Sequence, residues 1–217
     1  MIGYAALSPH PPLIIPVIGG SSLEDVKATV SGMKEMAREL VDSKPDSLVF
    51  LTPHGNVFAD CLSALSEEEL QGDFRNFGSK LGTSRRNDKV LLDEIETGAR
   101  KAGISFITLS AETLRLHHLN PRLDHGILVP LHYLEEAGLP QIPILAISVG
   151  FLSPLELYTF GVVIRDAALA QGKKLAVVAS GDMSHRLKNE GPYDYHPDGA
   201  VFDQQVQQIL RAGDSEA

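Results

Sequence analysis

The chain has 217 residues, of which 43% are hydrophobic and 22% are charged, and these values are typical of a globular protein. Its length suits one domain, or one domain plus an appendage, and is sufficient to bury a stable core. The 19 basic and 28 acidic residues give a formal net charge of −9 at pH 7. A field of that sign repels nucleic acid and anionic membranes, so we expect neither as a partner.

Cysteine content and proline positions indicate where the protein resides. The single cysteine, Cys61, excludes an intrachain disulfide and any metal site built from several cysteines. This usage fits a reducing cytoplasm. Two uncharged stretches, 1–23 and 137–155, contain prolines throughout, which is incompatible with a continuous membrane-spanning helix. We therefore expect a cytoplasmic protein, and the sequence leaves open whether it forms a homo-oligomer.

Short apolar runs alternate along the chain with amphipathic segments. Most of these runs are hydrophobic at consecutive positions, as is typical of parallel strands that helices cover on both faces. We therefore predict an α/β fold, a three-layer α/β/α sandwich with a largely parallel central sheet. The expected strands, in chain order, are residues 2–7, 47–52, 57–65, 104–109, 142–148 and 175–180.

Helix signals lie between these strands. Ser21 and Glu24 have the spacing of a capping box, and Ser153-Pro154-Leu155-Glu156 combines an N-cap serine with proline at N1 and glutamate at N3. The polar segment 67–86 predicts a surface loop with room for one helical turn. The expected helices are residues 21–43, 88–102, 125–137, 153–171 and, after a long loop over 181–199, 200–211.

Three of the eight histidines follow expected strand ends. His10 and His54 close the same phrase, Leu-Ser/Thr-Pro-His, and His185 follows the strand at 175–180. Ligands of open parallel sheets bind outside the carboxyl ends of the strands, so we expect all three at one rim. Imidazole suits iron, zinc, copper or nickel, and two histidines with one carboxylate suit non-haem Fe(II). The alternative is a set of turn histidines without a metal.

The remaining candidates carry less weight. His125 opens an expected helix directly after Asp124, which is able to orient its ring or to cap the helix, so a role near the substrate and a structural role are both open. His132 lies in an apolar helix segment and is interpreted as structural, and Cys61 as buried filler. No G-x-S-x-G elbow, Walker loop or G-x-G-x-x-G fingerprint is present.

Four motifs, in chain order, are SPHPP near the start, TPHG after the second expected strand, DHGILVPL at mid-chain and ASGDMSHRL late in the chain. Together they resemble the LigB-type class III extradiol ring-cleavage dioxygenase superfamily, and GDMSHRL and GPYDYHPDGAVFD are most similar to its AmmeMemoRadiSam system branch. The resemblance extends over essentially the whole chain, so residues 1–217 are expected to form a single LigB-like catalytic domain. It implies a mixed sheet and an Fe(II) site. It further implies that His10 and His54 are metal ligands, that His185 is the acid/base histidine and that His125 is a further pocket histidine.

One position departs from the family. The third metal ligand of the family, usually Glu and in some relatives Cys, lies well past the position of Asp203, and no such motif is found here. The third ligand is therefore expected to be another residue, such as Asp182 or Glu24, or to be absent. A chain truncated at its C-terminus is a further alternative.

The expected function is that of an extradiol-type dioxygenase. It would cleave a catechol-like aromatic ring with O₂ at non-haem Fe(II), with an aromatic diol and O₂ as its partners. His185 would accept a proton from the diol and return it later. Two alternatives remain: a non-catalytic metal-binding or interaction protein of the AmmeMemoRadiSam type, and a Zn-dependent hydrolase that uses the same histidines.

Overall fold

The computed structural model describes residues 1–190 and 193–213. The chain divides into two compact units, Met1–Gly181 and a second unit that begins at Asp182, and each is described by itself. Whether they act as the single domain expected from the sequence stays a prediction. None of the helices in the described residues has the length and hydropathy needed to span a bilayer.

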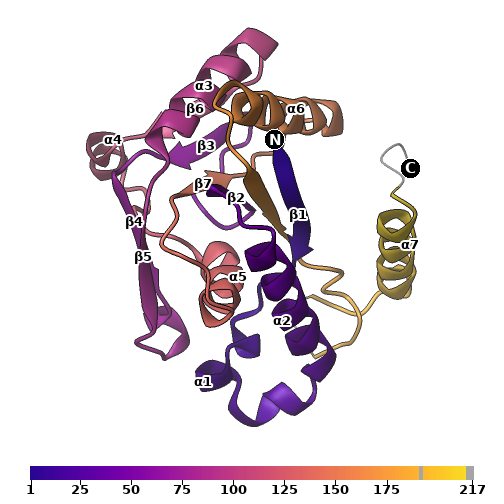
Figure 1. Ribbon diagram of the computed structural model, residues 1–217. Helices are drawn as coiled ribbons and strands as arrows, with labels where there is room; N and C mark the ends of the chain where they lie inside the picture. Colours follow the sequence, from indigo (N-terminus) through magenta and orange to yellow (C-terminus); the bar gives the residue numbers. More distant parts are fainter. Residues whose placement is uncertain (191–192, 214–217) are drawn as a thin grey trace. The chain divides into compact units, whose positions relative to one another are not determined.

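A six-stranded sheet forms the centre of the first unit, in the order β1-β8-β2-β7-β3-β6 (Figure 1). Neighbouring strands are parallel except for β3 and β7, which are antiparallel. The predicted mixed, largely parallel sheet is therefore confirmed. Its strands are β1 (Ile2–Ser8), β2 (Ser47–Thr52), β3 (Leu62–Leu65), β6 (Phe106–Leu109), β7 (Ile144–Ser148) and β8 (Leu175–Ser180).

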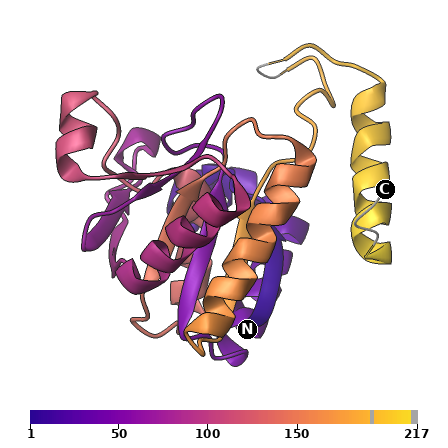
Figure 2. The same cartoon turned by 90° about the horizontal axis from the view of Figure 1, so that it is seen from above.

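Helices cover both faces of this sheet, with α3 and α6 on one side and α2 and α5 on the other (Figures 1 and 2). The α/β/α sandwich is thus confirmed for the first unit. The helices of the described residues are α1 (Pro16–Gly19), α2 (Lys27–Asp42), α3 (Lys89–Ala102), α4 (Ala111–Leu116), α5 (His125–Glu136), α6 (Pro154–Ala170) and α7 (Asp198–Ala212), with short 3₁₀ helices η1 (Pro12–Ile14), η2 (Gly20–Glu24) and η3 (Arg75–Phe77).

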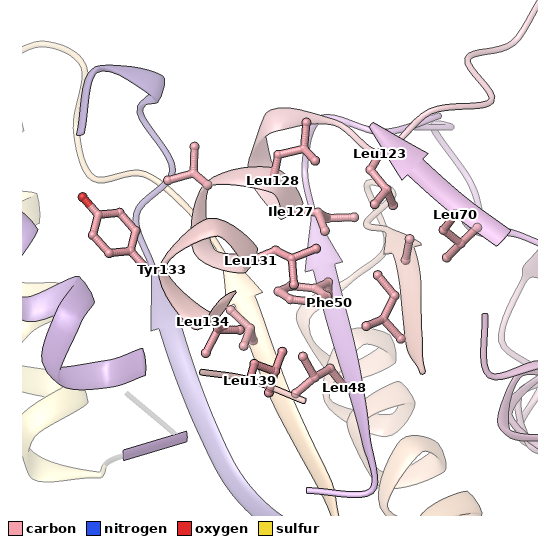
Figure 3. Packing of buried hydrophobic residues seen from close by; sticks show 14 of the residues in the cluster. Leu48, Phe50, Leu70, Leu123, Ile127, Leu128, Leu131, Tyr133, Leu134 and Leu139 are labelled. Carbon is pink, nitrogen blue, oxygen red and sulfur yellow. The ribbon is translucent and has the colours of Figure 1, made fainter. Parts of the chain in front are cut away.

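Strand β2 shows why the apolar runs are continuous. Leu48 and Phe50 are fully buried and pack with α5, where Leu131 and Leu134 lie beside them (Figure 3). Val49, whose side chain points to the other face, is equally buried and packs with the cluster of α3 and α6. Because both faces of the strand are covered, every position favours an apolar side chain.

The segment 67–86 is a hairpin and not the surface loop that its polar composition predicts. Strands β4 (Glu69–Asp73) and β5 (Gly82–Arg86) pair in antiparallel fashion. Leu70 is buried in the same cluster as α5 (Figure 3), and Arg85 is 2% exposed. The guanidinium of Arg85 donates to Glu135 Oε1 at 2.8 Å and to the Pro140 carbonyl at 2.7 Å. An ion pair between the buried Arg85 and the half-buried Glu135 of α5 therefore anchors a strand whose polar composition is typical of a solvent-exposed segment.

The predicted start of a helix is correct where the predicted N-cap hydrogen bonds form and wrong where they do not. Ser153 Oγ accepts from the Glu156 amide at 3.3 Å and Glu156 Oε2 accepts from the Ser153 amide at 2.8 Å, so the predicted capping box of α6 is confirmed. The pKa of Glu156 is lowered because the Ser153 hydroxyl donates to its Oε2 at 2.6 Å and the Ser153 amide donates to the same oxygen. At the N-terminal helix no such box forms, since Glu24 ends η2 and pairs with Lys27, where α2 begins.

The expected strand over 57–65 is shorter in the structure. β3 starts at Leu62, and Cys61 directly before it lies outside the strand. Cys61 is half-buried, and this burial, reinforced by the charge of Asp60, raises the pKa of its thiol. Helix α4 covers residues that the sequence analysis assigned to no element.

In the second unit, a hydrogen bond connects the loop before α7 to that helix. The Ser184 amide donates to Asp203 Oδ1 at 2.8 Å, and the His196 amide donates to the Arg186 carbonyl at 3.0 Å. These bonds hold the loop that carries His185.

Candidate metal centre

The carboxyl ends of β1, β8 and β2 lie at one edge of the sheet because these strands are parallel neighbours. Ser8 of β1 pairs with Ser180 of β8, and Leu51 of β2 pairs with Ala179. His10 and His54 each follow the last residue of their strand by two positions. The repeated strand-end phrase therefore brings two imidazoles to the same rim, as expected from the sequence.

Three imidazoles converge there. The Nε2 atoms of His10 and His54 are 2.8 Å apart. The third ring belongs to His125, the first residue of α5, and its centroid lies 4.3 Å from that of His54 and 5.4 Å from that of His10. One ring nitrogen from each histidine lies within 4.8 Å of the other two. His10 is buried, His125 is half-buried and His54 is exposed.

A serine hydroxyl orients the buried ring. Ser180 Oγ is 2.7 Å from His10 Nδ1, and both groups are shielded from solvent. Because the Nδ1 side of the ring is held by Ser180, Nε2 points to His54. A hydroxyl that accepts a hydrogen bond from Nδ1–H favours the tautomer whose Nε2 lone pair is available for a metal.

A single threonine links the other two histidines. The Oγ1 atom of Thr52 donates to Asp124 Oδ1 at 2.7 Å and accepts from the His54 amide at 3.2 Å. Asp124 Oδ1 also accepts from the Gly126 amide at 2.7 Å, which caps α5. Of the two uses foreseen for Asp124, the structure shows the helix cap. Thr52 thus positions the backbone of His54 and the start of the helix that carries His125.

The close approach of α5 to the strand ends requires glycine at position 126. A Cβ atom there would lie 2.4 Å from Thr52 Oγ1, 2.8 Å from Asp124 Oδ1 and 3.2 Å from Ser180 Oγ. Any larger residue would push the helix away from the rim. The small residue in the phrase Asp124-His125-Gly126 is therefore part of the site.

The donor set fits a divalent transition metal. Imidazole nitrogens suit iron, zinc, copper and nickel. With metal–nitrogen bonds of about 2.0–2.1 Å, two ligands at a right or tetrahedral angle lie about 2.9–3.4 Å apart. The 2.8 Å between His10 Nε2 and His54 Nε2 needs a shift of only a few tenths of an ångström to reach this range. Among the residues that the structure describes, the cluster holds histidines alone and no carboxylate.

The remaining candidates belong to other segments of the chain. Glu24 is exposed and pairs with Lys27, outside the cluster. Asp182 opens the second unit, and its Oδ2 is 3.3 Å from His185 Nε2, whose ring stacks on Tyr193. Since the placement of the second unit against the first is not determined, His185 is described only within its own unit. The catalytic and ligand roles assigned from the sequence stay predictions.

A cavity of about 400 Å³ opens beside the exposed part of the cluster. His54 and His125 line it, together with residues from η3 and from the segment before α5. The ring of Phe77 stands edge-on to His125 at a centroid distance of 5.3 Å. Sequence analysis did not identify this cavity, because its walls come from the hairpin segment that was expected to be a loop.

Replacing Ser180 with alanine tests the orientation of His10. We expect Ser180→Ala to weaken Zn²⁺ and Fe²⁺ binding about 10–100-fold, the usual effect of removing a partner of a ligand. Competition with a chromophoric chelator measures this affinity. The matched control is Ser8→Ala, because Ser8 is also buried, lies on the neighbouring strand and has a hydroxyl that contacts Pro9 and Met33. Equal affinity in the two variants would contradict the assignment.

Substitution of Gly126 tests the contact between α5 and the rim. Gly126→Ala should lower both the melting temperature and the metal affinity, because the new methyl group meets Thr52 Oγ1. The control is Gly161→Ala in α6, where a Cβ meets no atom within 4 Å. Alanine there should raise the free energy of unfolding by roughly 0.5–1 kcal/mol. A Gly126→Ala protein that melts and binds metal like the parent would refute the close contact.

Comparison with known proteins identifies a relative and a family. A curated relative, Protein CA_C1420 of Clostridium acetobutylicum, is 30% identical over 211 residues, which make up 97% of this chain and 45% of that protein. The chain thus spans less than half the length of this relative. Residues 4–217 match the family described as the catalytic LigB subunit of aromatic ring-opening dioxygenase. Because this match covers nearly the whole sequence, the chain belongs to the LigB catalytic subunit family.

Proposed function

We propose that the protein is an extradiol-type dioxygenase that opens a catechol-like aromatic ring with O₂ at a non-haem Fe(II) ion. One observation carries the proposal: three imidazoles converge at the carboxyl ends of parallel strands in a chain of the LigB family. His10, His54 and His125 would hold the metal. The third position, for which the sequence suggested Asp182 or Glu24, is thereby given to His125.

The protein supplies a preorganised rim for this ion. When bound, Fe(II) provides open positions for the diol oxygens and O₂ and acidifies the diol. Three neutral imidazoles bring no negative charge to the site, so it attracts an anionic oxygen more strongly than a site with a carboxylate ligand. His10 is buried against Ser180, whereas His54 and His125 line the open cavity. Substrate therefore enters from the side of His54 and His125.

His185 is proposed as the proton-transfer group. Its side chain is 49% exposed, and Asp182 Oδ2 lies 3.3 Å from its Nε2. A carboxylate at that distance orients the ring, which suits a group that takes a proton and returns it. The resemblance of the phrase GDMSHRL to the family supports this role.

The donor set also favours a second candidate. Three histidines without a carboxylate are the protein ligands of some catalytic zinc sites, where zinc lowers the pKa of bound water. A Zn-dependent hydrolase on the same fold is therefore the alternative. Metal analysis after anaerobic purification, together with O₂ uptake in the presence of a catechol, separates the two activities.

The ligand assignment is best tested at His54, because its side chain is exposed and its loss leaves the core intact. His54→Ala should abolish tight Fe²⁺ binding while the melting temperature of the metal-free protein stays near that of the parent. His10→Ala should also lose the metal but with lower stability, since His10 is 1% exposed. His132→Ala, on the same helix as His125 and outside the cluster, is the control. Undiminished iron binding by His54→Ala would exclude it as a ligand.

His185 should affect turnover and not occupancy. We expect His185→Ala to keep its iron while catechol-dependent O₂ uptake falls roughly 10²–10⁴-fold, the usual contribution of a positioned proton-transfer group. His196→Ala is the matched control, because His196 lies in the same loop, is 49% exposed as well and also faces an aspartate. Loss of iron in His185→Ala would make this residue a ligand instead. Equal turnover in His185→Ala and His196→Ala would show that His185 has no catalytic role.

A further inference from the structure

Helix α6 lies at the surface of the first unit, beside α3 (Figure 2), and its outer face is apolar. The outer apolar residues recur at helical spacing and are Leu155, Tyr158, Val162 and Leu169. Leu155, Tyr158 and Leu169 are 74%, 64% and 56% exposed. Val162 is half-buried. Because the opposite face of α6 packs on the sheet, the helix is apolar on both sides, as is typical of a helix that is covered on both sides.

The outer faces of α2 and α3 carry charges instead. Exposed charged residues include Lys34 on α2 and Asp93 and Arg100 on α3. The outer face of α6 holds one basic and one acidic residue, Arg165 and Asp166, whose side chains pair at 2.8 Å. This pair adds no net charge, so two copies of the face do not repel one another.

The residues of this face are arranged almost symmetrically about Val162. Leu155 lies seven residues before Val162, and Leu169 lies seven residues after it. Tyr158 lies four residues before Val162, and Asp166 lies four residues after it. Two antiparallel copies of α6 that cross at Val162 therefore place leucine opposite leucine. They also place a hydroxyl donor opposite a carboxylate, once in each half of the contact.

The backbone and the polar groups of this face are compatible with close contact. A Cβ atom at Gly161 would meet no atom within 4 Å, so the position beside Val162 leaves room for a side chain of a second copy. Thr159 Oγ1 donates to the Leu155 carbonyl at 2.7 Å, so this hydroxyl keeps a partner when water is removed. In an antiparallel pair the positive end of each helix dipole also lies near the negative end of the other.

We propose that the outer face of α6 is the interface of a homodimer, in which α6 packs antiparallel to α6 of a second copy about a twofold axis at Val162. A twofold interface joins the same patch of both copies, and the symmetry of this face meets that requirement. Helices α6 and α5 cover opposite faces of the sheet (Figures 1 and 2), so the interface lies away from the helix that carries His125. The inference is independent of the proposed function.

The mass of the full chain in solution tests the dimer. We expect analytical ultracentrifugation to give the mass of two chains. Since a single pair of helices forms a small interface, the dissociation constant should be on the order of 1–100 μM. The buffer contains a chelator, so that exposed histidines do not join two chains through a metal. The measurement needs neither iron nor a catechol, so its result is separate from the test of ring opening.

Two double variants test the antiparallel pairing. Leu155→Lys with Leu169→Glu places opposite charges across the interface in both halves and should still dimerise. Leu155→Lys with Leu169→Lys places like charges there and should raise the dissociation constant at least about tenfold above that of the first variant. Both variants lose the same two exposed leucines. Lysine at position 169 suits the C-terminal end of a helix better than glutamate, so a less stable fold does not explain the loss of the dimer.

Leu116→Lys is the control for an exposed leucine outside the interface. Leu116 is 64% exposed and lies on α4, so this variant should dimerise like the parent. A parent chain that stays monomeric at concentrations of about 100 μM would overturn the proposal. Equal dissociation constants for the two double variants would also overturn it, as would loss of the dimer in Leu116→Lys.

Discussion

The contact between the start of α5 and the ends of β2 and β8 is the constraint on which the site depends. Thr52 Oγ1 and the Asp124 carboxylate are 2.7 Å apart, and Gly126 leaves room for both beside Ser180. Without this contact, His125 would belong to an ordinary helix covering a sheet. With it, the helix delivers a third imidazole to a rim where two strands have already placed His10 and His54.

The same contact connects the metal cluster to the adjacent cavity. Residues just before α5 contribute Arg122, and hairpin β4–β5 contributes Arg75 and Phe77, while Arg85 of that hairpin is anchored by Glu135 of α5. Helix α5 therefore carries the third histidine, begins at the cap that positions it, and holds the β4–β5 hairpin in place. Charges gather on the open side of the cluster, whereas its buried side is held by a neutral hydroxyl.

The fold and two of the three histidines of the cluster were predictable because they depend on local patterns. Continuous apolar runs indicate buried parallel strands, and a repeated phrase after two of them indicates two histidines at one rim. The family resemblance gave His125 as a pocket histidine. Its place within the cluster was not predictable, because it depends on how closely a helix packs and not on spacing along the chain. The hairpin was missed for a related reason: its polar residues include the buried Arg85, whose half-buried partner Glu135 lies 50 residues away. The small residues Thr52, Ser180 and Gly126 were the available signal for this close packing. They can be recognised as neighbours only in the folded structure.

The central claim is that His10, His54 and His125 together hold one metal ion. X-ray absorption at the iron edge of the Fe(II)-loaded protein tests it directly, because scattering from imidazole rings reports how many are bound. We expect three imidazoles at about 2.1 Å in the parent and two in His125→Ala. A spectrum with two imidazoles in the parent, unchanged in His125→Ala, would contradict the account. His125 would then lie near the metal without binding it.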